Sequence, residues 1–418
     1  MSVQESVGTA RIWRLGRGHQ LLFFLACGFP INFLSMVGFL IPLRAHELGA
    51  PLELVGVIVG AGAVLGMVLA VPAGALADRM GPRQAFVIGT LLNGLAALGF
   101  WLAESYWLIL AFQFARGLPH SLSWVASQSY LSTIGDPAER TALAGKFSFA
   151  SGLGGLISPL VIGTVATFMG FQNSFAVVVL YCLLTVLMGL ALPDVRSPRG
   201  QASTSSGGYA EAATLLRQRG PQVAVLLTFV RLWVGTGWNA FFPIYLAERG
   251  FSPAVIGSVV SGSGLVSSVT GLSAHRLARR TSNQVATAAA LALGAFGTAI
   301  SPHVAFIPLV YAPALFQGVG AGFSMPLVLA MLSQEVPASQ RGIAMGLRTG
   351  ANQAGNLVAP VVTGVLIGAF GLPLGFLGSA VLCWSVLGFA LWLHAGGPAE
   401  SRPDSAKVIQ SAEKHGSA

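Results

Sequence analysis

The sequence predicts an all-α integral membrane protein with twelve transmembrane helices in two pseudo-symmetric six-helix bundles. Three observations support this prediction: the composition, the number of long apolar runs, and an internal repeat. Of the 418 residues, 54% are hydrophobic and only 9% are charged, whereas about a quarter of the residues in an ordinary soluble domain are charged. The chain also contains 53 glycines, and small residues allow membrane helices to pack closely. A water-soluble globular protein is therefore excluded.

Twelve apolar runs are long enough to cross a bilayer. A helix needs about 20 apolar residues to span roughly 30 Å of hydrocarbon. The fourth, fifth, tenth and eleventh runs exceed this length, which indicates tilted helices or helices that continue into water. The predicted spans are 21–43, 54–76, 85–102, 107–131, 142–168, 174–192, 222–246, 254–272, 285–301, 304–332, 342–370 and 374–393.

The basic residues predict the orientation of these spans. Of the 23 Lys and Arg residues, 18 fall in loops and tails on one side, two fall on the other side, and three lie within spans. Because cytoplasmic loops are enriched in Lys and Arg, we expect both termini in the cytoplasm of a bacterium, with the chain in the inner membrane. The net charge of +9 does not indicate a nucleic-acid partner, since the basic residues form no continuous stripe.

Composition divides the chain into five segments. A linker rich in Ser, Gly and Arg separates two apolar halves, and such a linker is flexible. The predicted segments are a cytoplasmic N-terminal segment at 1–20, an N-terminal six-helix bundle at 21–193, a cytoplasmic linker at 194–220, a C-terminal six-helix bundle at 221–394 and a cytoplasmic tail at 395–418.

The two halves repeat each other at an offset of 201 residues. The matched pairs are Pro42 and Pro243, Glu47 and Glu248, Gly49 and Gly250, Gly56 and Gly257, Gly154 and Gly355, Pro159 and Pro360, and Gly163 and Gly364. Parallel six-helix repeats are typical of secondary transporters, in which the substrate site lies at the repeat interface near the bilayer midplane. The repeat therefore predicts alternating access between two bundles.

A loop after the second span resembles a known family. It resembles the signature loop between the second and third helices of the major facilitator superfamily, although Pro82 stands at a position that is usually basic. This resemblance implies the major facilitator fold of twelve helices. The matching residues are Gly74, Leu76, Ala77, Asp78, Arg79, Gly81 and Arg83.

Two further motifs resemble the same family. Arg116 resembles its embedded arginine in the fourth helix, but Pro119 and His120 replace the Gln and Gly expected after it. The fifth span is similar to the Gly-Pro motif of the exporter and antiporter branch, on the residues Gly154, Ser158, Pro159 and Gly163. The second resemblance implies a 12-helix antiporter of drugs or metabolites.

Seven residues are expected to act in conformational gating. Asp78 ends the second helix, where a carboxylate can accept charge-assisted hydrogen bonds from Arg side chains or from a helix N-terminus. Such a clasp would hold the outward-open state and break when the halves move. In the second half this loop matches at an offset of 197 residues, and His275 replaces Asp78 there. The glycines and Pro159 allow close contact and a bend. The full gating set is Gly74, Asp78, Arg79, Gly81, Arg83, Gly154 and Pro159.

The substrate site is predicted from charges within the spans. Every Asp and Glu lies in a loop, a tail or near a span end, whereas Arg116, Arg231 and Arg348 lie within spans. Ionisable groups at this depth are functional candidates, and an anionic or zwitterionic substrate would neutralise them. Polar residues at three- and four-residue spacing extend these positions into stripes that would line a cavity. The predicted binding set is Gln113, Arg116, His120, Trp124, Arg231, Trp238, Asn239, Gln317, Arg348, Asn352 and Asn356.

Proton coupling has four candidate residues. His120 can change its charge near neutral pH, although a packing role is equally open. Asp78 is a second candidate, and Glu47 and Glu248 occupy symmetric outer positions. Arg348 lies near the inner end of its span, where a long side chain can extend to water instead of binding a substrate.

The leading hypothesis is a secondary active transporter, specifically a proton-coupled exporter of a drug-like compound or metabolite. The alternatives are an organic anion transporter that uses the embedded arginines, by proton symport or anion exchange, and a transport-inactive membrane sensor or scaffold. The sequence contains no enzyme motif, ATP-binding loop or metal-ligand cluster, so we expect no catalytic residue, cofactor or metal. The expected partners are a small solute, protons and the bilayer, and we expect a monomer.

Overall fold

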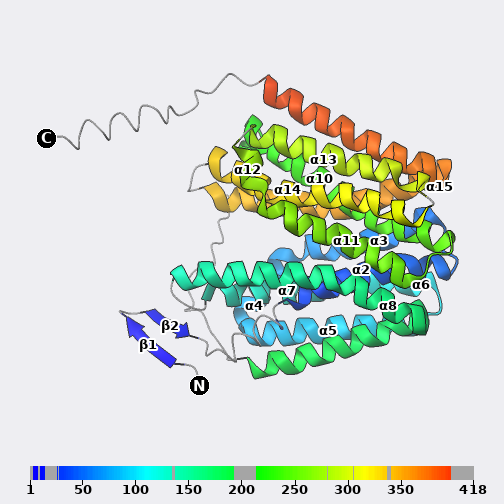
Figure 1. Cartoon of the computed structure of the whole chain (residues 1–418). Coiled ribbons are helices and arrows are strands. Elements are labelled where there is room, and N and C mark those ends of the chain that lie inside the picture. Colours follow the sequence, from blue (N-terminus) through cyan, green and yellow to red (C-terminus); the bar gives the residue numbers. More distant parts are fainter. Residues whose placement is uncertain are drawn as a thin grey trace.

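A computed structural model describes residues 3–7, 10–14, 26, 28–133, 137–192, 213–279, 281–304, 306–336 and 340–396. Most of this part of the chain is helical, and the helices run roughly along one axis (Figure 1). Seven of the described helical segments are long and apolar enough to cross a membrane. Two of these seven contain a break at Gly170 or Gly371, so each of them provides two spans.

The first half of the chain builds six spans. The long helix α8 covers the fifth and sixth spans, because Gly170 breaks it with a φ of 76°. The helices are α2 (Phe29–Glu47), α3 (Leu52–Val68), α4 (Ala70–Met80), α5 (Pro82–Leu102), α6 (Tyr106–Ala115), α7 (Gly117–Thr133) and α8 (Pro137–Ala191).

The second half builds the other six spans in the same order. Gly371 breaks the last helix, α15, with a φ of 78°. The elements are α10 (Arg219–Glu248), α11 (Pro253–Leu272), α12 (Ala274–Ala278), α13 (Asn283–Ile300), the short 3₁₀ helices η1 (Ser301–His303) and η2 (Ile307–Val310), α14 (Tyr311–Glu335) and α15 (Arg341–Ala395).

The second and fourth spans each consist of two helices rather than one. Span 2 breaks between α3 and α4 at Leu69, and span 4 breaks between α6 and α7 at Arg116. Proline has no N–H group to bond the carbonyl four residues earlier, and Pro72 and Pro119 each follow such a break by three residues. The breaks therefore have a local cause that the apolar pattern alone does not reveal.

The N-terminus differs from the all-helical expectation. Strand β1 (Val3–Val7) pairs antiparallel with strand β2 (Ala10–Arg14), with Val3 opposite Arg14. β-branched residues such as Val and Ile favour strands, and these strands contain several of them. Residues 15–25, which include the start of the first predicted span, lie outside the described part of the chain.

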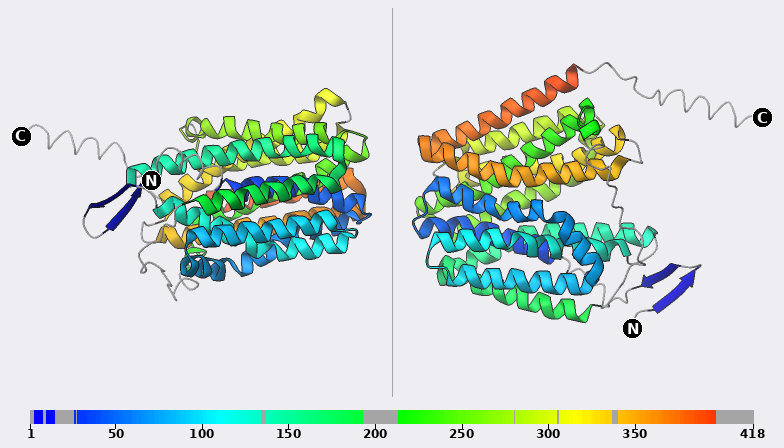
Figure 2. Two further views of the ribbon diagram at one scale, coloured as in Figure 1. Left: turned by 90° about the horizontal axis from the view of Figure 1, so that it is seen from below. Right: turned by 180° about the vertical axis from the view of Figure 1, so that it is seen from behind.

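The two halves lie side by side, with the hairpin, the end of α8 and the start of α10 at one end of the molecule (Figures 1 and 2). We call this the linker end and the opposite end the far end. One apolar core fills the N-terminal half and continues at the far end into Phe241, Ile244 and Ile367 of the C-terminal half. A second core, around Leu227 and Met331, belongs to the C-terminal half alone.

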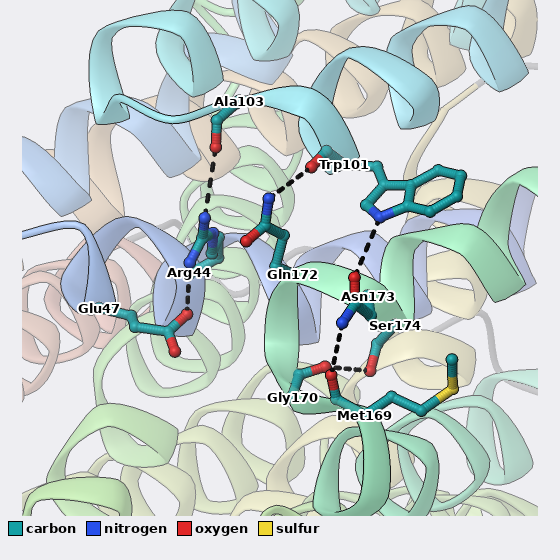
Figure 3. Close-up of polar contacts among 9 residues, drawn as sticks. All are labelled: Arg44, Glu47, Trp101, Ala103, Met169, Gly170, Gln172, Asn173 and Ser174. Atoms are coloured by element: carbon teal, nitrogen blue, oxygen red, sulfur yellow. Dashed lines mark hydrogen bonds and ion pairs between the residues drawn. The ribbon is translucent and has the colours of Figure 1, made fainter.

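Polar contacts tie the turns together at the far end (Figure 3). Gln172 donates to the carbonyl of Trp101 at 3.1 Å, and the Trp101 indole donates to Asn173 at 3.3 Å. Arg44 donates to the carbonyl of Ala103 at 3.4 Å. These bonds fix the turn at Gly170 and the end of α2 against the end of α5.

The repeat recurs in the backbone conformation. Gly49 and Gly250, which are 201 residues apart, both have a φ of 81°. Residues with side chains rarely adopt such a positive φ, so these two turns require glycine. The offset found in the sequence thus corresponds to matched turns in the two halves.

Two symmetric pairs of glycines allow the halves to touch. A Cβ atom added at Gly56 would collide with the carbonyl of Pro360, and one at Gly257 would collide with the carbonyl of Pro159. Gly163 meets the carbonyl of Pro253, and Gly364 meets that of Leu52. Helix α3 thus packs on α15, and α8 packs on α11. We call these four contacts the glycine seam, and they close the far end.

We predict that Gly56→Ala opens the glycine seam. The added methyl group has no space against the Pro360 carbonyl, and overpacking of this kind costs about 1–3 kcal/mol, which is about 5- to 150-fold in the closure equilibrium. Spin labels at Glu104 and His303, which are exposed at the far end of one half each, should report a longer distance. The control is Gly152→Ala, because a Cβ there has nothing within 4 Å. Unchanged distances in Gly56→Ala would contradict the role of the seam.

Candidate functional site

A cavity of about 360 Å³ lies between the two halves, and both halves supply its walls. The N-terminal half contributes Leu34, Ser35, Gly38, Phe39, Val59, Gly62, Ala63, Gln113, Arg116, His120, Gly155 and Pro159. The C-terminal half contributes Thr236, Asn239, Ala240, Pro243, Val260, Ser263, Gly264, Gln353 and Asn356. These residues include no Asp or Glu, so Arg116 is the one fixed charge in the lining of this cavity.

Arg116 lies at the break between α6 and α7. Its side chain is only 5% exposed, and its Nε donates to Oε1 of Gln113 at 2.6 Å. Gln113 in turn donates to the carbonyl of Val59 on α3 at 3.3 Å. This chain of two hydrogen bonds fixes the direction in which the guanidinium points.

Helix α3 makes room for the guanidinium through a glycine. A Cβ added at Gly62 would lie 2.7 Å from Nη2 of Arg116 and 2.9 Å from Nε2 of Gln113. A Cβ added at Gly117, the residue after Arg116, would lie 2.8 Å from the backbone N of Gly66 on α3. The close approach of α3 to the α6–α7 break is therefore part of the site.

His120 lines the cavity one helical turn after Arg116. Its Nδ1 atom is buried and has no hydrogen-bond partner among the described residues. The imidazole therefore has an unused polar atom beside the arginine.

The C-terminal half faces Arg116 with neutral polar side chains. Asn239 donates to the carbonyl of Gly235 at 2.9 Å, and Asn356 donates to Oε1 of Gln353 at 3.4 Å. Thr236 donates to the carbonyl of Leu232 at 2.6 Å. The side-chain oxygen of each of these residues can still accept a hydrogen bond from a molecule in the cavity.

Five residues of the predicted binding set line this cavity, and the others lie elsewhere. The five are Gln113, Arg116, His120, Asn239 and Asn356. Sequence reasoning missed the polar residues Ser35, Thr236, Ser263 and Gln353. Gln353 stands three residues before Asn356, a spacing that places both on one helix face, whereas the predicted stripe ran through Asn352.

Three residues of the predicted set do not reach the cavity. Trp238 stacks on Phe242 at 4.9 Å and donates to Ser301 at 3.0 Å, so it belongs to the core. The Gln317 amide donates to Thr298 at 2.6 Å and to the carbonyl of Gly294, between α13 and α14. Trp124 is 37% exposed and is not part of the cavity wall.

Arg231, Arg348 and Asn352 also lie outside the cavity wall. They form a separate group on α10 and α15, in which Arg231 donates to Oδ1 of Asn352 at 3.3 Å. This group lies closer to the linker end than Asn239 and Asn356, which follow later on the same helices.

The loop between α4 and α5 is fixed within the N-terminal half. Gly81 has a φ of 85° and joins the two helices, and the Arg83 guanidinium donates to the carbonyl of Leu190 at the end of α8. Arg79 is exposed, and a Cβ at Gly74 would meet nothing within 4 Å. The side chain of Asp78 lies outside the described part of the structure, so its predicted clasp stays a prediction.

The remaining gating candidates lie in helix contacts of α8. A Cβ at Gly154 would collide with the Asn32 amide of α2, and Asn32 donates to the hydroxyl of Tyr181 at 3.1 Å. Pro159 belongs to the glycine seam through Gly257 and also lines the cavity. The seam and the cavity wall therefore share one residue.

The two symmetric glutamates at the far end have different partners. Glu47 pairs with Arg44 of its own helix at 2.8 Å, whereas Glu248 pairs with His46 of the other half at 3.2 Å. The sequence analysis did not select His46. Only the pairing of α2 with α10 brings His46 to Glu248, and no spacing in the sequence indicates that contact.

Two helix bundles around a central polar cavity define a class of protein: a membrane transporter of the alternating-access type. The family model of the Major Facilitator Superfamily matches residues 22–316 and 288–415, and the chain belongs to this family. The protein is thus a transporter rather than an enzyme, and it is a multi-pass membrane protein.

Known proteins of this family resemble the chain over most of its length. The probable sulfoacetate transporter SauU of Cupriavidus necator is 27% identical, over 86% of this chain and 90% of that protein. The sugar efflux transporter A of Dickeya chrysanthemi is 25% identical, over 80% of this chain and 86% of that protein. The crystal structure of the nucleoside transporter NupG matches with a TM-score of 0.73 at 13% identity, over 90% of this chain and 98% of that one.

We predict that Glu248→Gln weakens far-end closure, whereas Glu47→Gln does not. The first substitution alters a contact between a carboxylate and an imidazole of the two halves, and the second removes an ion pair within α2. A partly exposed pair contributes about 0.2–1 kcal/mol, which corresponds to at most about a fivefold shift. The labels at Glu104 and His303 measure this shift for both variants. An equal response of the two variants would contradict a role for the His46 pair in closure.

Proposed function

We propose that the protein is a secondary active transporter of small organic anions. The observation that supports this proposal is the buried guanidinium of Arg116 in a cavity without a lining carboxylate. A buried charge without a counter-charge is unfavourable inside a membrane. A carboxylate or sulfonate on the substrate would provide that counter-charge and could accept two parallel hydrogen bonds from the guanidinium.

The cavity also suits the remainder of such a substrate. A volume of about 360 Å³ is at the low end of the range of small-molecule sites. The neutral polar groups of Asn239, Asn356 and Thr236 would bind hydroxyl or amine groups on the C-terminal side. Leu34, Phe39 and Val260 provide apolar surface for a short carbon skeleton. The name of the relative SauU, a probable transporter of the organic anion sulfoacetate, supports the same substrate class.

Transport would use the glycine seam as one of two alternating closures. In the described conformation the far end is closed, and opening of the seam would expose the cavity there. The 18 basic residues of the linker-end loops and tails favour a cytoplasmic linker end. We therefore propose a monomeric protein of the bacterial inner membrane, with both termini in the cytoplasm and the cavity accessible in turn from each side.

The second candidate function is proton-coupled export of a drug-like compound or metabolite. Gly155 and Pro159, from the segment that resembles the exporter motif, line the cavity, and the name of the sugar efflux relative points in the same direction. His120, Asp78, Glu47 and Glu248 stay the candidates for the proton site. Everted vesicles that accumulate an uncharged compound when their lumen is acidified would support this function over the first.

We predict that Arg116→Gln lowers anion uptake about 10- to 100-fold, since a hydrogen bond to a charged group contributes about 1.5–3 kcal/mol. The measurement is uptake of sulfoacetate, and of a panel of other carboxylates and sulfonates, by proteoliposomes. Arg276→Gln is the control, because it removes an equal charge from an exposed position on α12. Equal losses of anionic and neutral solutes in Arg116→Gln would contradict direct anion binding.

We predict that Gly62→Ala also lowers anion uptake, without the loss of any charge. The new Cβ would occupy the space of the Arg116 and Gln113 side chains and turn the guanidinium away. Gly38→Ala is a matched control in the same cavity, since a Cβ there has nothing within 4 Å. Uptake and thermal unfolding of both variants separate a local effect from misfolding. If the two variants transport anions equally well, Gly62 does not position Arg116.

A further inference from the structure

A second group of arginines lies outside the central cavity. It consists of Arg231 on α10 and Arg348 on α15, and we call it the linker-side pair. Both residues are partly exposed. Neither belongs to the wall of the cavity that contains Arg116.

The linker-side pair has weak partners. Arg231 donates from Nη2 to Oδ1 of Asn352 at 3.3 Å. Nη1 of Arg348 has only the thioether sulfur of Met325 at 3.9 Å, and a thioether is a weak acceptor. The Nε of Arg348 is buried and has no hydrogen-bond partner among the described residues. Two guanidinium groups therefore have most of their donors available.

No carboxylate compensates these charges in the described part of the chain. The described ion pairs are Arg44 with Glu47 and His46 with Glu248, both at the far end. Asn352, which accepts the hydrogen bond from Arg231, stands four residues after Arg348 on α15, so the two arginines share the contact between α10 and α15. Two like charges with unused donors in a partly dehydrated site favour the binding of an anion.

The helix geometry separates this pair from the central cavity. Arg231 precedes Asn239 by eight residues on α10, and Arg348 precedes Asn356 by eight residues on α15. At 1.5 Å per residue, each interval is about 12 Å. Both intervals run toward the linker end, so the Cα atoms of the pair lie on the linker side of Asn239 and Asn356, which line the cavity.

We propose that Arg231 and Arg348 form a second anion site, which binds a carboxylate, sulfonate or phosphate group between the linker end and the central cavity. The role of this site in transport rests on the proposed function. An anion that enters or leaves at the linker end binds here before or after its contact with Arg116. The positive field of the pair raises the local concentration of anions at that entrance.

The test uses the full chain in lipid nanodiscs with inorganic sulfate as the probe. Sulfate affinity is measured by calorimetry at constant ionic strength, in the wild type and in Arg116→Gln. The Arg116→Gln protein should retain a sulfate site, and Arg348→Gln or Arg231→Gln in that background should weaken it at least tenfold. The control Arg276→Gln should leave it unchanged. Equal weakening by Arg276→Gln, or none by Arg348→Gln, would overturn the proposal.

Asn352→Asp, made in the Arg116→Gln background so that the central site binds no sulfate, provides a test with nearly unchanged side-chain size. The new carboxylate would pair with Arg231, raise the unfolding temperature in sulfate-free buffer and abolish the further rise caused by sulfate. A sulfate effect that persists in Asn352→Asp would overturn the second site. The outcome for the proposed function is separate, because a wild-type protein that takes up no organic anion would refute that function while sulfate binding at the linker-side pair would persist.

Discussion

The burial of the Arg116 guanidinium without a counter-charge among the described residues is the constraint on which the central site depends. A free cation at this depth is unfavourable, and several features nevertheless hold Arg116 in place. Pro119 breaks the helix at this residue, Gln113 binds the Nε atom, and Gly62 leaves space for the side chain. A site that only packed two halves together would need none of these features. They make sense if the missing counter-charge arrives with the substrate.

The second constraint is the close approach of the two halves at the far end. The carbonyls of Pro159 and Pro360 are contacted by glycines at symmetric positions, so the internal repeat produces two equivalent contacts. Backbone contact of this kind leaves no space for an added side chain. Pro159 also lines the cavity, so the occupant of the cavity and the closed seam contact the same residue.

Much of the fold could be predicted from the sequence, since apolar runs and a 201-residue offset report directly on spans and symmetry. The helix breaks at Leu69 and Arg116 could not be predicted, because the mean hydropathy of a whole span does not change at a break. For the site, helical spacing indicated Arg116, Gln113 and His120. Spacing cannot distinguish a stripe that faces a cavity from one that faces a neighbouring helix, which is why Asn352 was selected although it binds Arg231 outside the cavity wall. No spacing or pattern in the sequence indicates a contact between the halves such as that of His46 with Glu248.

The most direct test of the central claim places a carboxylate in the cavity. Gly38 lines the cavity, and a side chain there meets nothing within 4 Å of its Cβ, so Gly38→Asp and Gly38→Asn differ in charge but hardly in shape. The measurement is the uptake of a transported anion by proteoliposomes that contain each variant. If the substrate supplies the counter-charge of Arg116, Gly38→Asp will lose anion uptake and Gly38→Asn will retain it. Equal uptake by the two variants would contradict the account.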